Sequence, residues 1–163
     1  VELYYESLCY DSIQFIKNQL IPTYQQLGNY FTVTYIPYGK HQRITDRNGI
    51  EKWHFTCQHG PPECYGNKAQ VLTQTSFYCV LNFQIFSNII SSVNNCISST
   101  RGDDLLAAHG EKTFSLQPNI GFVPTIVING VFSDENQRNS LRNFKSTICS
   151  FIAAQSRPVV CSG

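Results

Sequence analysis

The hydrophobic positions in the first part of the chain change period twice, which predicts a strand, a helix and a second strand. Residues 1–7 are rich in residue types that favour strands. From 12 to 27 the apolar side chains recur at helical spacing, with Gly28 as a stop signal, and Pro22 is expected to bend or break this helix. Residues 30–36 then alternate between apolar and polar. This order is the start of a parallel crossover unit.

Polar residues dominate the next segment, and helical periodicity returns after it. Residues 38–66 carry scattered charges and the turn signals Asn48-Gly49 and Pro61-Pro62, so we expect a loop there. The apolar side chains from 67 to 97 recur at helical spacing, and a further helix is predicted over 103–114.

The last part of the chain predicts a hairpin followed by a helix. The apolar run 122–128 leads into Asn129-Gly130, a strong hairpin signal, after which the chain is expected to return as a second strand. A final helix is predicted over about residues 134–154, with Ser133 as its N-cap. The predicted order is therefore βαβ, a helical insertion and then ββα. This is the α/β arrangement of a thioredoxin-like fold with helices inserted midway.

Length and composition limit the number of domains and the classes of partner. A chain of 163 residues is most simply one domain, so we expect a single thioredoxin-like domain over 1–163, with a helical insertion subdomain at about 64–115. The formal net charge is +1 and no apolar run approaches the ~20 residues of a membrane span, so we expect neither nucleic-acid binding nor membrane insertion. Seven cysteines favour an oxidising compartment, which predicts a secreted or lumenal, disulfide-stabilised protein.

The candidate chemistry centres on Cys9, which comes where the first predicted strand ends and the first helix begins. Unpaired backbone N–H groups at a helix start favour a thiolate, and a thiolate attacks disulfides to form a mixed disulfide. The alternative is a structural cysteine, buried or paired elsewhere. A resolving thiol normally follows one helical turn later, but this chain has Ser12 there, which either leaves a one-thiol site or simply caps the helix.

The segment from Cys57 to Asn67 carries the most specific motif in the chain. It matches in full the signature Cys-Gln-His-Gly-x-x-Glu-Cys-x-x-Asn, and by this motif the chain resembles the gamma-interferon-inducible lysosomal thiol reductase family. Residues 3–9, 36–39 and 122–124 resemble that family as well. The chain is thus identified as a divergent member with Cys-x-x-Ser in place of Cys-x-x-Cys. The signature residues are Cys57, Gln58, His59, Gly60, Glu63, Cys64 and Asn67.

The resemblance implies a thioredoxin-like fold and, in active members, reduction of protein disulfides in endosomes and lysosomes. The attacking cysteine of the family matches Cys9, and Ser12 stands at the resolving position. Pro124 matches the cis-proline that lies across from the thiol and offers backbone groups to an extended peptide, so a cis Val123–Pro124 bond is expected. The predicted substrate-binding residues are Tyr10, Asp11, Val123, Pro124 and Thr125.

The pairing of the cysteines rests partly on the resemblance. If Cys9 stands apart, nearest-neighbour pairing joins Cys57 with Cys64, Cys79 with Cys96, and Cys149 with Cys161. The first and third of these pairs resemble family bridges, while other pairings stay open, because sequence alone does not establish connectivity. A monomer is expected, and an unpaired Cys9 leaves a Cys9-linked dimer as the alternative.

A metal site is not expected in the signature loop. His54, Cys57, His59 and Cys64 are of zinc-ligand types, but their spacing fits no common zinc pattern, so we expect no metal and no cofactor. Gln58 and His59 either lie near the active site or hold the loop through hydrogen bonds, and the structural role is favoured.

Three interpretations of the Cys-x-x-Ser site stay open. In the first, a secreted or endosomal-lysosomal protein has lost most or all dithiol reductase activity and acts by protein binding. In the second, Cys9 attacks and an outside thiol resolves the mixed disulfide. In the third, Ser12 was introduced into an active reductase. The missing sulfur favours the first, with a protein or a disulfide-containing polypeptide as the partner.

Overall fold

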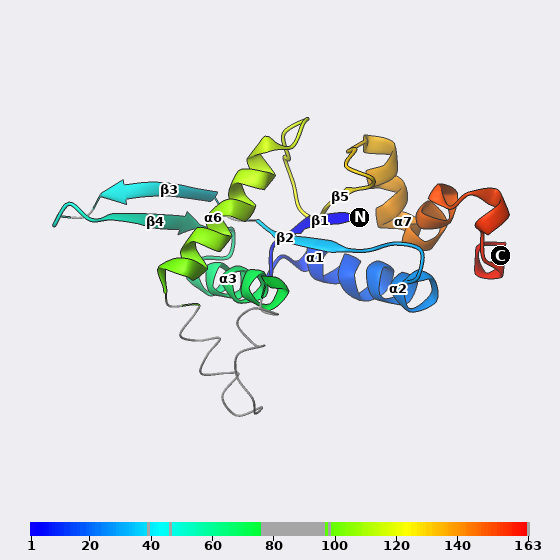
Figure 1. Ribbon diagram of the computed structural model, residues 1–163, viewed down its shortest axis with the longest axis horizontal. Helices are drawn as coiled ribbons and strands as arrows, with labels where there is room; N and C mark the ends of the chain where they lie inside the picture. The colour runs from blue at the N-terminus through cyan, green and yellow to red at the C-terminus, as the bar shows by residue number, and fades with distance from the viewer. Residues whose placement is uncertain (39, 46, 76–96, 98, 163) are drawn as a thin grey trace, which may run out of the picture.

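The structure is a computed structural model that describes residues 1–38, 40–45, 47–75, 97 and 99–162 (Figure 1). Its strands are β1 (Glu2–Tyr5), β2 (Thr34–Pro37), β3 (Lys40–Thr45), β4 (Glu51–Thr56) and β5 (Thr125–Val127). Its helices are α1 (Tyr10–Phe15), the π-helical η1 (Ile16–Leu20), α2 (Ile21–Leu27), α3 (Pro61–Thr75), α6 (Thr100–Ser115), α7 (Asp134–Phe151) and the short 3-10 turns η2 (Ala154–Ser156) and η3 (Val159–Cys161). Within these described residues, no helix is both long and apolar enough to cross a membrane.

A three-stranded sheet in the order β2-β1-β5 forms the centre of the fold. β1 runs parallel to β2, with Leu3 opposite Tyr35, and antiparallel to β5, with Leu3 opposite Ile126. Parallel neighbours require a crossover connection, and the helical stretch from α1 to α2 supplies it. The predicted βαβ start and the α/β class are therefore confirmed.

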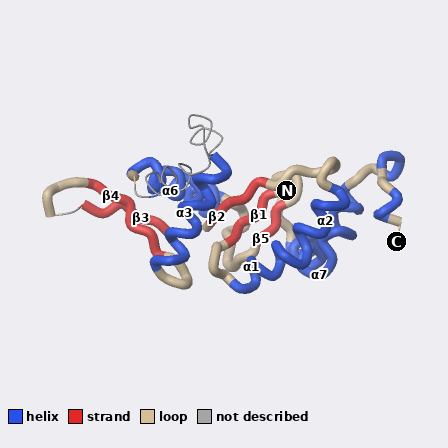
Figure 2. Tube along the Cα trace, turned by 90° about the horizontal axis from the view of Figure 1, so that it is seen from below, coloured by secondary structure: helices blue, strands red, loops and turns tan. Residues whose placement is uncertain are grey.

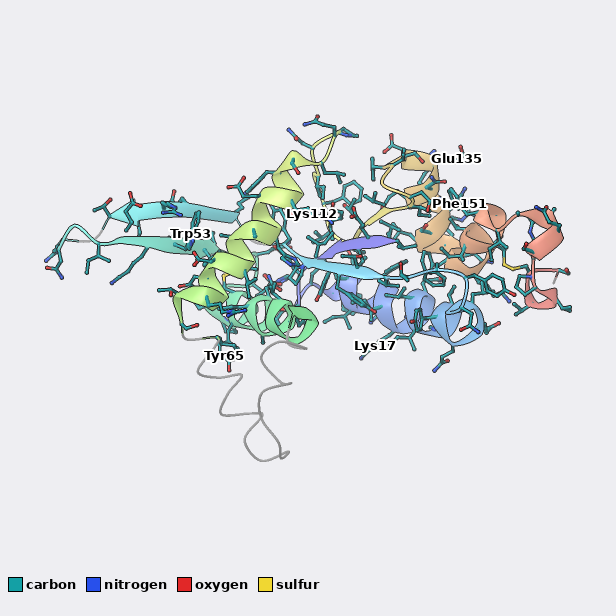
Figure 3. All side chains as sticks on the ribbon, in the orientation of Figure 1. Lys17, Trp53, Tyr65, Lys112, Glu135 and Phe151 are labelled. Atoms are coloured by element: carbon teal, nitrogen blue, oxygen red, sulfur yellow. A yellow bond between two sulfur atoms is a disulfide. The ribbon has the colours of Figure 1, made fainter. Side chains whose placement is uncertain are left out.

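The two faces of the sheet bury two separate cores, because alternate side chains of β1 point to opposite faces. On one face Leu3 and Tyr5 pack with Phe15 and Phe144, so that α1, α2 and α7 cover this side (Figure 2). On the other face Tyr4 packs with a smaller group of apolar residues, Ile36 and Val127. Helix α6 is tied to β1 by an ion pair of 2.6 Å between Lys112 Nζ, labelled in Figure 3, and Glu2 Oε1.

The predicted loop over 38–66 is wrong, because most of it forms the antiparallel β3–β4 hairpin and the start of α3. The hairpin extends away from the sheet at one end of the molecule (Figure 2). Its strands are largely exposed and mostly polar, and the half-buried Trp53 and Phe55 of β4 form an apolar alternation too short to mark a strand in sequence. A long-range contact holds it to α6, because Trp53 Nε1 donates a 2.7 Å hydrogen bond to Asp104. Within the hairpin, the Arg43 guanidinium lies 4.5 Å from the ring centre of Trp53, its partner on the opposite strand.

The helices differ from the predicted ones mainly at their ends. The chain stays helical from 10 to 27 and does not break at Pro22. The π-helical segment η1 precedes this proline, and Ile21 N–H donates a hydrogen bond to Ile16 O. This shift of hydrogen bonding comes just before the residue that lacks an N–H group. Helix α3 begins at Pro61 rather than at residue 67. Most of the predicted helix 67–97 beyond Thr75 lies outside the described residues.

The end of the chain keeps the predicted turn but shortens the hairpin. The expected second strand is reduced to a single bridge between Ile128 and Val131 in the described chain. Helix α7 starts as predicted, since Ser133 Oγ accepts a 3.1 Å hydrogen bond from Asn136 N–H, and it ends at Phe151 rather than near residue 154.

Candidate functional site

Cys9 occupies the N-cap position of α1, where the chain leaves β1 and enters the first helix. Its N–H donates to Glu6 O at 3.2 Å, and its carbonyl accepts from Ile13 N–H at 3.0 Å. Among the cysteines that the structure describes, Cys9 has the free thiol. The residue is 7% exposed, and Sγ lies 3.8 Å from the carbonyl oxygen of Val123. The Val123–Pro124 bond is cis, as the resemblance implies.

Ser12 lies inside the first turn of α1 and is 0% exposed. The alternative that Ser12 caps the helix is wrong, because Cys9 holds the N-cap position and the Ser12 hydroxyl makes no capping hydrogen bond. Its Oγ is buried without any hydrogen-bond partner among the described residues. A buried hydroxyl group therefore lies one helical turn after Cys9, at the position predicted for a resolving thiol.

A cavity of about 620 Å³ opens beside Cys9. A second cavity of about 390 Å³ lies beyond the segment that carries Phe122 and Val123, and Pro124 contributes to its wall. Both cavities are bordered by Asp11, Phe122 and Val123. The segment opposite Cys9 therefore contributes to the walls of both cavities. The larger cavity is lined by Glu6, Cys9, Asp11, Tyr38, Lys40, Thr56, Cys57, Gln58, Ile120, Gly121, Phe122 and Val123.

The predicted substrate-binding residues differ in their accessibility. Tyr10 is 70% exposed, Asp11 is exposed and Val123 is half-buried. Thr125 is buried in β5, and its hydroxyl donates a 2.6 Å hydrogen bond to Phe122 O. The Thr125 side chain therefore stabilises the turn beside Pro124, and a role of Thr125 in substrate binding stays a prediction.

Glu63 of the signature is fully buried and holds the turn that presents Cys9. Its Oε1 accepts a 3.2 Å hydrogen bond from Leu8 N–H and lies 2.8 Å from His59 Nδ1. Its Oε2 accepts from His59 N–H at 2.7 Å. Gly60 lies between them at φ +78, a left-handed conformation that favours glycine. Glu63 and His59 therefore connect the signature loop to the residue next to Cys9.

Asn67 of the signature also contacts the segment before Cys9. It lies on α3, one helical turn after Glu63. Its Oδ1 accepts from Ser7 N–H at 2.8 Å, and its Nδ2 donates to Tyr38 O at 2.7 Å. Between Glu63 and Asn67, a Cβ on Gly66 would lie 2.5 Å from Ser7 Oγ, so glycine allows the close approach of helix and turn. The sequence reasoning missed Gly66, which occupies a variable position of the signature.

Glu6 is a site residue that the sequence reasoning missed. It is 3% exposed, and its Oε2 has no hydrogen-bond partner among the described residues. Burial raises the pKa of Glu6 to about 7, and the charge of Glu63 raises it as well, whereas His59, the Gln58 backbone and Lys40 lower it. The available signal was an acidic residue at the end of a buried strand, three positions before the candidate nucleophile.

The stability of the protein should therefore depend on the ionisation of Glu6. Because the folded-state pKa of about 7 lies above the ordinary value of 4.5, the folded state binds the proton more tightly. The stabilisation that comes from this tighter proton binding is fully present below the ordinary pKa of 4.5 and is lost as the pH rises through about 7. We expect the melting temperature of the parent, relative to Glu6→Gln, to fall between about pH 5 and about pH 8. Parallel curves for the two proteins would contradict this.

The cysteines and His59 of the signature loop, which are of metal-binding residue types, bond to other residues of that loop. Cys57 and Cys64 form a disulfide, so neither offers a thiolate, and His54 is exposed on β4. The described residues bring Glu6, His59 and Glu63 together with their ligand-type atoms all within 4.8 Å. These three could hold an ion, although His59 and Glu63 already bond to each other.

Two of the three predicted disulfides are present in the structure. Cys57–Cys64 ties the end of β4 to the first turn of α3, and Cys149–Cys161 ties the C-terminal turns to α7. The third predicted pair, Cys79 with Cys96, lies outside the described residues. The first bridge closes the signature loop, and Glu63 of this loop bonds to Leu8 next to Cys9.

Comparison with known proteins finds relatives along nearly the whole chain. The family model described as "Gamma interferon inducible lysosomal thiol reductase (GILT)" matches residues 1–111. GILT-like protein 1 of Drosophila melanogaster is 30% identical over 198 residues, covering 99% of this chain and 78% of that protein. The Gamma-interferon-inducible lysosomal thiol reductase-like protein of Anopheles gambiae is 29% identical over 195 residues, covering 99% and 79%. Gamma-interferon-inducible lysosomal thiol reductase of Mus musculus is 27% identical over 184 residues, covering 99% and 71%.

Proposed function

This chain belongs to the gamma-interferon-inducible lysosomal thiol reductase family, and we propose that it is a one-thiol member whose dithiol reductase activity is lost or strongly impaired. In this proposal Cys9 forms mixed disulfides with polypeptides, and the protein acts by binding them. Resolution of the mixed disulfide needs a thiol from outside the chain.

The observation that carries this proposal is the burial of Ser12 one helical turn after Cys9, at 0% exposure. A resolving group must attack the Cys9 sulfur and end in an S–S bond, which a hydroxyl cannot form. The intramolecular attack that releases substrate in a two-thiol site is therefore missing. A mixed disulfide at Cys9 persists until another thiol reaches it.

The surface around Cys9 supports a polypeptide as the partner. Leu8, Tyr10 and Phe122 each expose a large apolar side chain near the thiol. Apolar side chains around a cavity with polar walls suit an extended chain, whose own polar backbone needs partners. The carbonyl of Val123, 3.8 Å from Cys9 Sγ, belongs to the segment that such a chain would lie against.

We place this function in a secreted or endosomal-lysosomal compartment. The matching family is described as lysosomal, and two disulfides are present in the described chain. Structural disulfides persist in oxidising surroundings and are rare in the cytosol.

The proposal is tested with a labelled disulfide peptide and with insulin, each with and without a small outside thiol. Without that thiol, we expect one peptide per chain to become attached and no turnover above background. The attachment should disappear in Cys9→Ala and stay in the surface variant Asn139→Ala, whose exposed side chain lies on α7. Mass spectrometry of the intact chain measures the adduct.

The outside thiol separates binding from catalysis. If the outside thiol produces multiple turnover that requires Cys9, the protein is an exchange catalyst and not a binding protein. In that case the outside thiol resolves the mixed disulfide. Absence of any adduct at Cys9 would contradict both functions.

A further inference from the structure

Glu6, His59 and Glu63 form a cluster of side chains that metal ions bind. One ligand-type atom from each residue lies within 4.8 Å of the other two. Glu6 directly follows β1, whereas His59 and Glu63 belong to the signature loop and the start of α3. The spacing within that loop fits no zinc pattern, because the third residue lies more than fifty positions earlier in the chain. The fold therefore assembles a ligand set that the loop alone does not contain.

The Glu6 carboxyl group is buried, and only part of its hydrogen-bonding capacity is used. The residue is 3% exposed, and the backbone of Gln58 hydrogen-bonds to the carboxyl group, which directs it toward the signature loop. Its Oε2 has no hydrogen-bond partner among the described residues. A buried polar atom without a partner is costly. A cation bound between the three residues satisfies this oxygen.

The charges of the cluster also favour a cation. Glu63 is 0% exposed, so two carboxyl groups are buried side by side, and two buried negative charges repel each other. The His59 side chain is 44% exposed and offsets one of these charges only when it is protonated. A divalent cation compensates both carboxylates at once.

Hydrogen bonds to the backbone hold Glu63 in place and leave it able to bind an ion. An ionised carboxylate has about four acceptor sites, and the N–H groups of Leu8 and His59 take two of them. Such bonds orient a carboxylate ligand from behind. The remaining contact joins Glu63 Oε1 to His59 Nδ1 at 2.8 Å. Zinc bonds of about 2.0 to 2.2 Å place ligand atoms about 3 to 3.5 Å apart, so small side-chain movements suffice.

We propose that Glu6, His59 and Glu63 form a binding site for Zn²⁺. Zinc takes an imidazole nitrogen together with carboxylate oxygens, whereas calcium and magnesium prefer oxygen ligands alone. Glu6 and Gln58 line the cavity of about 620 Å³, from which water can complete the coordination. The bound ion ties the end of β1 to the signature loop. The site goes beyond the proposed function, because zinc binding needs no reaction at Cys9.

The test is titration of the full chain with Zn²⁺ near neutral pH, by calorimetry, with the disulfides kept oxidised and bound metal first removed with EDTA. We expect one Zn²⁺ per chain. The melting temperature should rise with zinc concentration, because an ion that binds only the folded chain stabilises it. Glu6→Gln and His59→Ala should each weaken zinc binding about tenfold or more. A melting curve of each metal-free variant checks that it folds.

Three control variants remove other groups that could bind zinc. Glu2→Gln removes a carboxylate of β1 that is paired with Lys112. His54→Ala removes an exposed imidazole of β4, and Cys9→Ala removes the free thiol. Zinc should bind to all three with the affinity of the parent.

Two results would overturn the zinc site. One is the absence of zinc binding by the parent, and the other is an unchanged zinc affinity in a folded Glu6→Gln or His59→Ala variant. Both leave the proposed function standing, since the adduct at Cys9 is measured separately in the metal-free protein. Absence of that adduct would in turn leave the zinc site standing.

Discussion

A Ser12→Cys variant is expected to reduce disulfide substrates with multiple turnover, at least about 100-fold faster than the parent chain. Well-oriented intramolecular groups reach effective molarities of about 10⁵ M or more, far above any outside thiol. The introduced thiol would lie one helical turn after Cys9, at the position predicted for the resolving cysteine. Insulin reduction with a limiting outside reductant measures the gain.

The same substitution should also be tolerated by the fold. Ser12 Oγ is buried and has no hydrogen-bond partner in the part of the chain that the structure describes. A thiol is a weaker hydrogen-bonding group that behaves as a small apolar side chain. Loss of activity through misfolding is therefore not expected, and a melting curve checks it.

Two control variants isolate the contribution of the second sulfur. Ser12→Ala should remain as inactive as the parent, and Ser12→Cys combined with Cys9→Ala should show no turnover, because it lacks the attacking thiol. An inactive Ser12→Cys variant that is folded and forms the internal disulfide would show that the surroundings of Cys9 no longer support reduction. Strong activity would show that Ser12 alone separates this chain from a working reductase.

Asn67→Ala is expected to lower the free energy of unfolding by about 2 to 5 kcal/mol. The substitution removes the side-chain partners of two part-buried backbone groups, the N–H of Ser7 and the carbonyl of Tyr38. Each such group costs about 1 to 3 kcal/mol. Urea unfolding with the disulfides kept oxidised measures the change through Trp53, the single tryptophan of the chain.

Two further variants show whether the loss comes from these hydrogen bonds. Asn139→Ala, at an exposed position of α7, should stay within about 0.5 kcal/mol of the parent. Asn67→Asp keeps the acceptor for Ser7 but removes the donor to Tyr38, so an intermediate loss is expected. Equal stabilities for Asn67→Ala and Asn139→Ala would contradict the role of Asn67 in holding the Cys9 turn.

Local patterns predicted the elements whose apolar side chains face a core. The strand that carries Leu3 and Tyr5 was predicted from residue types that favour strands. The helix after it has clear periodicity, because one side of it packs against these two residues. The cap at Ser133 was predictable for a similar reason, since its hydrogen bond reaches only to Asn136. The hairpin β3–β4 was not predictable in this way, because its contacts to α6 involve residues far apart in sequence.

The sequence by itself determined the family, through the motif from Cys57 to Asn67. The order Cys9-Tyr10-Asp11-Ser12 predicts one sulfur where an active member has two. These are properties of residue order, and the comparisons confirm the family. It also placed Cys9 at a strand-to-helix junction, because local periodicity changes there.

Only the tertiary structure decided what surrounds that sulfur. Burial of Ser12 and Glu6 depends on packing of elements that meet only in the folded chain. Glu63 and Asn67 reach the Cys9 turn through hydrogen bonds that span more than fifty positions of the sequence. Such contacts leave no local periodicity, because the partners are brought together by the fold and not by their spacing. For this reason the signature could be recognised in the sequence. The hydrogen bonds by which it stabilises the Cys9 turn could not be predicted.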